Sequence, residues 1–204
     1  MKQIILSAAV IICSFAAMSA SAQQAAKLHT GDGIPGAQIK LQSVSGKEIS
    51  LSQEIGQNGL LVMFSCNTCP FVVRNQSVTE KVMKYAMAHH VGMVIINSNE
   101  NQRDGADSYE AMKKYAATQG YAVPYVVDHG SELADMFGAN HTPEIYLFNK
   151  EGKLTYQGAM NDNPSDLAGA KRMYITEAID AQAAGKSMNP DATKSVGCSI
   201  KRKA

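Results

Sequence analysis

A run of five consecutive apolar residues, 60–64, constrains the fold of this chain more than any other feature. A strand with one face in water alternates apolar and polar residues, whereas a strand covered on both faces is apolar throughout. Two more apolar segments follow at 91–97 and 121–127, and helical patterns, the longest over 71–89, lie between them. This alternation predicts parallel strands with helices on both faces of a sheet.

The last third of the chain adds a hairpin to that sheet. Residues 144–148 and 153–157 flank Asn149-Lys150-Glu151-Gly152, a typical hairpin turn. A final helix is expected from about Asn163 to Gly185. The sequence therefore predicts an α/β fold with a central mixed sheet, in one domain over residues 23–185. Residues 186–204 are predicted to form a polar tail that carries Cys198.

The first 22 residues have the pattern of a secretory signal peptide. Lys2 precedes an apolar stretch over 4–17, and Ala20-Ser21-Ala22 is a small-x-small cleavage site. We expect cleavage after Ala22, no stable membrane insertion afterwards, and a periplasmic or secreted protein. The alternative is an uncleaved anchor helix, although the apolar stretch is short for a membrane span.

Charge and cysteine content narrow the function. Without Lys2 the chain has 18 basic and 18 acidic residues, a balance that does not suggest nucleic acid or an anionic membrane as a partner. Without Cys13 three cysteines remain, namely Cys66, Cys69 and Cys198. That number is small and odd, so a reactive role is a better interpretation than a disulfide scaffold.

Cys66-Asn67-Thr68-Cys69 directly follows the apolar run. The first turn of a helix has unpaired N–H groups and the positive end of the helix dipole, which stabilise a thiolate. A second thiol, separated from the first by two residues, can release a mixed disulfide. A structural zinc ion normally needs four ligands, and the chain has no second cysteine pair. The motif therefore predicts redox chemistry without a metal or another cofactor.

Several segments resemble the thioredoxin-like superfamily: LLVMFSCNTCPFVV, VGMVIINSN, YAVPYVVD, LADMFGANHTPEIYLFN and LTYQGAMNDN. The resemblance covers about residues 31–201 and is strongest to the alkyl hydroperoxide reductase/thiol-specific antioxidant branch. That branch includes a peroxiredoxin-like group with a GCSIK-type tail, similar to residues 197–201 here.

The resemblance implies a thioredoxin-like fold in which a cis Pro143 faces the two motif cysteines. The backbone of Thr142 would then pair with an extended substrate segment. Two positions stay open. His141 either lies near the thiols and favours the thiolate, or faces solvent. Cys198 is a resolving or relay thiol, a free thiol on a loose end, or the partner of a cysteine in another chain.

Three functions fit these residues. The first is an exported thiol–disulfide oxidoreductase that acts on protein thiols and disulfides, with Cys66 attacking, Cys69 resolving, and a redox partner that the sequence does not identify. The second is a peroxiredoxin-like peroxidase that uses Cys69, which precedes Pro70 as the family pattern requires, although Cys66 stands where that pattern has a threonine. The third is a Cu(I)-handling module that uses the cysteine pair and His141. Pro70 suits the first turn of a helix, so Cys69 lies at the helix start if Thr68 is the N-cap, whereas in a helix that begins at Cys66 the proline falls where an N–H should be bonded.

Overall fold

The computed structural model describes residues 28–203, so the predicted leader over 1–22 lies outside the described residues. Five strands form the central sheet, in the order β5-β4-β3-β7-β8. Their bounds are Leu60–Ser65 (β3), Gly92–Asn97 (β4), Tyr125–Val127 (β5), Glu144–Phe148 (β7) and Leu154–Gly158 (β8). Strands β3, β4 and β5 run parallel, and β7 pairs antiparallel with both β3 and β8. The predicted mixed sheet is confirmed.

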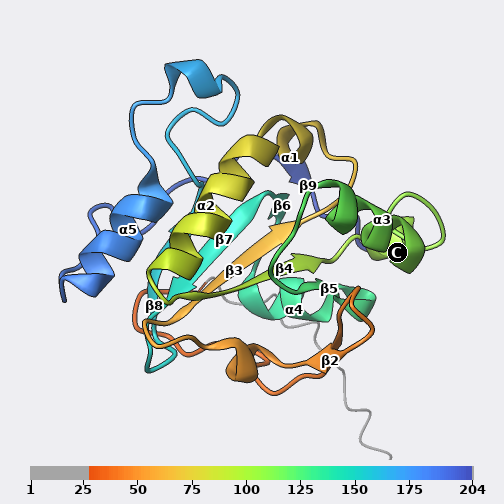
Figure 1. Cartoon of the computed structure of the whole chain (residues 1–204), viewed down its shortest axis with the longest axis horizontal. Coiled ribbons are helices and arrows are strands. Elements are labelled where there is room, and N and C mark those ends of the chain that lie inside the picture. Colours follow the sequence, from red (N-terminus) through yellow and green to blue (C-terminus); the bar gives the residue numbers. More distant parts are fainter. Residues whose placement is uncertain (1–27, 204) are drawn as a thin grey trace, which may run out of the picture.

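Helices cover both faces of the sheet (Figure 1). Their bounds are Pro70–Arg74 (α1), Gln76–Ala88 (α2), Tyr109–Thr118 (α3), Glu132–Phe137 (α4) and Tyr174–Ala183 (α5). Apolar side chains of α2, α3 and α5 pack on one face, and those of α4 pack on the other. The α/β class is therefore confirmed, with a separate core on each side of the sheet.

Strand β3 lies at the centre of this arrangement, and all six of its residues are buried. Leu61 and Met63 point into the core under α2, whereas Val62 and Phe64 point into the core under α4. Because successive side chains of a strand point to opposite faces, burial on both sides requires an unbroken apolar run. The strand predicted from that run is confirmed.

Two helix predictions are wrong in their bounds. The pattern over 71–89 forms two helices, α1 and α2, which meet at Asn75. The buried Asn75 Nδ2 donates to the carbonyl oxygens of Phe71, 2.8 Å away, and Pro164, 2.9 Å away, and so takes part in ending α1. The last helix starts at Tyr174 instead of about Asn163, because Asn163 Oδ1 accepts from the Asp166 amide in a turn that competes with helix.

Two short ladders lie outside the main sheet. Strands β1 (Leu41–Gln42) and β2 (Glu48–Ile49) pair on the α4 side, and β6 (His141–Thr142) pairs with β9 (Cys198–Ser199). In Figure 1, β9 lies beside β6 and close to α1, so the polar tail returns to the centre of the molecule. Within residues 28–203, no helix is long and apolar enough to cross a membrane.

Candidate active site

The cysteine motif lies between the end of β3 and the start of α1. Cys69 is the N-cap residue of α1, and Pro70 is its first residue, where a missing N–H costs little. The peptide bond between Thr142 and Pro143 is cis. Thr142 lies against both motif cysteines, so the segment that the family resemblance singled out and the cysteine pair meet at one place.

The two sulfurs make different contacts with Thr142. Cys66 Sγ lies 3.5 Å from the Thr142 hydroxyl oxygen, and Cys69 Sγ lies 3.1 Å from the Thr142 carbonyl oxygen. In addition, Cys66 and Cys69 form one buried cluster with Val72. Both cysteines are buried, and neither forms a disulfide.

These contacts separate the two pKa values. The hydrogen bond from Cys66 is the largest influence that lowers the pKa of Cys69, to about 4, and donation by Cys198, Val72 and Thr142 adds to it against the effect of burial. The Thr142 carbonyl oxygen favours a protonated Cys69, but several converging donors outweigh that single acceptor. Donation to Cys69 and burial together raise the pKa of Cys66, and the nearby charge of Asp107 raises it further. The contacts therefore favour the thiolate on Cys69, opposite to the assignment expected from the thioredoxin resemblance.

The residues that flank the two cysteines differ in solvent exposure. Cys69 lies between Thr68 and Pro70, both of which are exposed, whereas Cys66 lies between the buried residues Ser65 and Asn67. A molecule that approaches from solvent therefore meets the backbone around Cys69 first.

A buried carboxylate holds the turn between the cysteines. Asp107 Oδ1 accepts from the Asn67 backbone N–H and from Asn97 Nδ2, both at 2.8 Å, and Asp107 Oδ2 accepts from Asn99 Nδ2 at 2.9 Å. The Asn67 side chain donates to the Ala106 carbonyl oxygen at 2.8 Å and accepts from the Tyr125 hydroxyl at 2.9 Å. These bonds fix the residue next to Cys66 on three sides.

Asp107 is a residue of the site that could not be predicted from the sequence. Its only signal is indirect: the polar residues 97–99 follow the second apolar strand, at the same edge of the sheet as the cysteines. Carboxyl ends of parallel strands meet at one edge, which is where sites form in such sheets. The loop that carries Asp107 back to that edge has no recognisable pattern.

The other predicted residues are also placed here. Cys198 is half-buried and packs on the cluster formed by Cys66, Cys69 and Val72. The half-buried His141 shares a hydrogen bond of 3.2 Å through Nδ1 with the Ser195 hydroxyl. Across residues 28–203, no group of three or more His, Cys, Asp and Glu side chains is placed to hold a metal ion.

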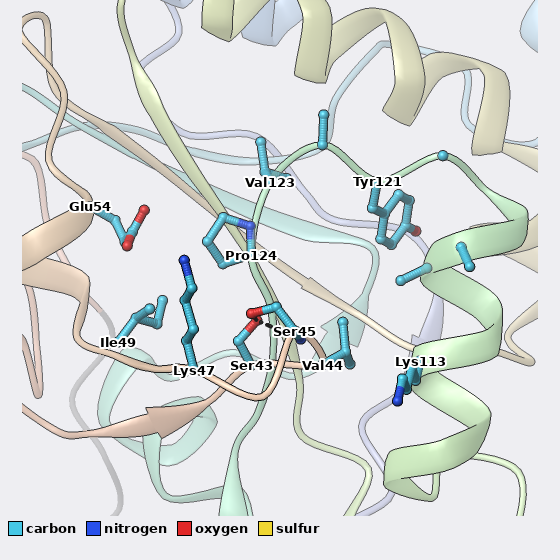
Figure 2. Close-up of a pocket in the computed structure, with 14 residues that line it drawn as sticks. Ser43, Val44, Ser45, Lys47, Ile49, Glu54, Lys113, Tyr121, Val123 and Pro124 are labelled. Carbon is cyan, nitrogen blue, oxygen red and sulfur yellow. Dashed lines mark hydrogen bonds between the residues drawn. The ribbon is translucent and has the colours of Figure 1, made fainter.

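A separate hollow of about 710 Å³ lies elsewhere, between the β1–β2 hairpin, the end of α3 and the start of β5 (Figure 2). Lys47 and Lys113 line opposite sides of it, with Glu54 beside Lys47 and Tyr121 beside the end of α3. No cysteine is among its lining residues. The thiol site and this hollow are therefore distinct features of the molecule.

Comparisons with known proteins identify the family of this chain. The sequence profile of the Redoxin family matches residues 29–174. The structure is similar to that of an uncharacterized conserved protein from Geobacillus kaustophilus, with 33% identity, coverage of 86% of this chain and 93% of that one, and a TM-score of 0.79. The thiol-disulfide oxidoreductase ResA of Halalkalibacterium halodurans is 23% identical over 60% of this chain, a match that spans 66% of that relative, slightly under two thirds of its length. Peroxidoxin BcpB of Mycobacterium tuberculosis shares the fold, with 14% identity, coverage of 76% and 92%, and a TM-score of 0.52.

Proposed function

Because the chain belongs to the Redoxin family and is an oxidoreductase, we propose that it is an exported thiol–disulfide oxidoreductase that acts on protein thiols and disulfides through Cys66 and Cys69. The observation that carries this proposal is the meeting of the two motif cysteines in one buried cluster against Thr142, where the pKa of Cys69 is lowered and that of Cys66 is raised. The ResA relative, a thiol-disulfide oxidoreductase, supports this proposal.

The proposed reaction starts with the Cys69 thiolate. It attacks one sulfur of a substrate disulfide, forms a mixed disulfide, and releases the other substrate sulfur as a thiolate. Cys66 then loses its proton to that leaving thiolate and attacks Cys69 Sγ. The products are a Cys66–Cys69 disulfide and a substrate with two thiols. An external dithiol, the redox partner that the chain needs, returns the pair to the reduced form.

The thiolate assignment gives each of the two sulfurs a defined protonation state in this mechanism. Donors around Cys69 hold it ionised at neutral pH, whereas Cys66 keeps the proton until Cys69 is bonded and uncharged. At that point Cys66 no longer has an anion to donate to, so its proton is lost more readily. Cys69 therefore acts as the nucleophile and Cys66 as the resolving thiol, and no separate base is needed.

The test is the reduction of insulin disulfides with dithiothreitol as the external dithiol. Cys69→Ser should remove turnover and the mixed disulfide alike. Cys66→Ser should lose the Cys66–Cys69 disulfide but still react with the substrate disulfide through Cys69. Turnover by Cys69→Ser at the wild-type rate would contradict the proposal, as would a mixed disulfide found on Cys66 in that variant.

One observation favours a second function, a peroxiredoxin-like peroxidase. Cys69 combines a depressed pKa with the position directly before Pro70 at the start of α1. A thiolate of this kind could attack a peroxide oxygen, giving sulfenic acid on Cys69 and releasing water or an alcohol. Rapid, stoichiometric sulfenic acid formation on Cys69 with hydrogen peroxide would support this function. A rate no higher than that of free cysteine would exclude it.

Export is the remaining part of the proposal, and the leader pattern over 1–22 supports it. The mature protein, isolated from the producing cell, should begin at Gln23 and appear in the extracytoplasmic fraction. A full-length chain recovered from the cytoplasm with Met1 or Lys2 at its start would contradict both export and cleavage.

A further inference from the structure

The C-terminal tail returns to the cysteine site as strand β9. It pairs antiparallel with β6, so that Thr142 lies opposite Cys198 and His141 lies opposite Ser199. Residues directly opposite in an antiparallel pair project their side chains to the same face. Because the Thr142 hydroxyl lies 3.5 Å from Cys66 Sγ, this register directs Cys198 toward the motif thiols.

The tail makes backbone contacts on both sides of Cys198. After Cys198, the Ile200 amide donates to the Asn140 carbonyl oxygen at 3.0 Å, and the Lys201 amide donates to Asn99 Oδ1 at 2.8 Å. Before it, Gly197 lies so close to Thr142 that a Cβ there would overlap the Thr142 carbonyl oxygen. These contacts rule out a loose end, one of the alternatives that the sequence left open for Cys198.

The Cys198 side chain lies beside the motif cysteines. Cys198 packs on the buried cluster that Cys66 and Cys69 form with Val72, and Cys198 is one of the groups that lower the pKa of Cys69. Cys69 therefore has two thiol neighbours, Cys66 from its own motif and Cys198 from a chain segment more than a hundred residues away. A chain that used only the motif pair would not need the second neighbour.

This inference rests on the proposed disulfide exchange. We propose that Cys198 is a third redox thiol that provides a second route beside direct attack by Cys66: it resolves the mixed disulfide on Cys69 by forming a Cys69–Cys198 disulfide, which Cys66 then converts to Cys66–Cys69. In the first step, the thiolate of Cys198 attacks Cys69 Sγ and the substrate leaves as a thiolate, which takes up the Cys198 proton. In the second, Cys66 loses a proton, attacks Cys69 Sγ and releases Cys198, which is protonated again. Each step exchanges one disulfide for another, so the only net oxidant is the substrate disulfide.

The charges in the site give the steps an order. Burial raises the pKa of Cys198, and the adjacent Cys69 raises it further, so Cys198 stays protonated while Cys69 carries the negative charge. Once Cys69 is in a mixed disulfide, that charge is gone, and Cys198 ionises more readily. Reaction of Cys198 therefore follows reaction of Cys69.

The test uses the full mature chain, reduced and then treated with glutathione disulfide, with disulfides mapped by mass spectrometry. In Cys66→Ser, we expect an intramolecular Cys69–Cys198 disulfide in place of a lasting glutathione adduct on Cys69. The matched control is Cys66→Ser with Cys198→Ser and Ser199→Cys, which moves the tail thiol by one residue to the opposite face. Bridge formation should be on the order of tenfold slower in this control, because the reacting sulfurs are no longer aligned.

Two results would overturn the inference. One is a persistent glutathione adduct on Cys69 in Cys66→Ser, with Cys198 left as a free thiol. The other is equal rates of bridge formation with the thiol at 198 and at 199. Either result is compatible with a Cys198→Ser variant that still forms the Cys66–Cys69 disulfide and reduces insulin. Failure of the role proposed for Cys198 is therefore distinguishable from failure of the proposed function. Loss of insulin reduction by the wild-type chain would instead contradict the proposed function itself.

Discussion

At the residue scale, the division of one proton between Cys66 and Cys69 is the central property of the site. Free thiols ionise near pH 8.5, whereas the donors around Cys69 lower its pKa to about 4. We therefore predict that thiolate absorbance in the reduced protein persists through neutral pH and is lost as the pH falls through about 4. Because the folded pKa lies below the unfolded one, the ionised Cys69 also stabilises the reduced chain; this contribution is full above about pH 8.5, declines as the pH falls, and is gone below about 4.

Variants identify which sulfur gives that signal. Cys69→Ser should remove the thiolate absorbance at neutral pH. Cys66→Ala should keep it but move its midpoint to higher pH, because the largest donor to Cys69 is gone. Absorbance that survives Cys69→Ser and vanishes in Cys66→Ser would show that Cys66 is the ionised thiol.

Asp107 carries the second prediction at this scale. In Asp107→Ala, the Asn67 amide and the side chains of Asn97 and Asn99 lose their acceptor in the interior. We expect the free energy of unfolding to fall by about 2–4 kcal/mol, as is typical when buried donors to a charged group are left unpaired. Urea denaturation measures the loss. Asp104→Ala, in the same loop but exposed, should change stability by no more than about 0.5 kcal/mol, and an equal loss in both variants would contradict the role given to Asp107.

At the element scale, β9 depends on the absence of a side chain at Gly197. In Gly197→Ala, the new methyl group would meet the Thr142 carbonyl oxygen, so the strand must move away from β6. We predict faster hydrogen exchange at the amides of Ile200 and Lys201, whose acceptors lie on the other side of that contact. Gly33→Ala is a matched control, since Gly33 has open space around its Cα and no left-handed φ. Unchanged protection in Gly197→Ala would show that β9 does not need the close approach.

Elements differ in how far the sequence could predict them. Strand β3 could be predicted because burial on both faces leaves a local record, an unbroken apolar run. The break at Asn75 could not, because it depends on a bond to Pro164, a residue far along the chain. Strand β9 is the extreme case: two residues in a polar tail have no pattern of their own, and only the partner β6 makes them a strand.

The same distinction applies to the site at the scale of the whole molecule. The cysteine pair and the Thr142-Pro143 segment were accessible from short motifs, and the structure places them in contact. The preference for a thiolate on Cys69 was not accessible, because it arises from donors on three separate segments. Proximity of Cys198 was left open for the same reason, since contacts between distant segments depend on the complete fold.

The core under α4 supports that fold and carries the last prediction. Phe137 meets Phe64 of β3, Tyr146 of β7 and Phe148 of β7 edge to face, with ring centroids 5.3, 5.1 and 5.9 Å apart. Phe137→Ala should lower the free energy of unfolding by about 3–5 kcal/mol, the usual loss for a buried aromatic ring. Met136→Ala, on the same helix but at a side chain 40% exposed, should lose far less in the same urea titration. Since the ring lies in the core cluster on the α4 face and the thiols form a separate cluster, the folded Phe137→Ala protein should keep the Cys69 titration of the wild type. A shifted titration would mean that the packing of this core, in addition to the local donors, sets the ionisation of the site.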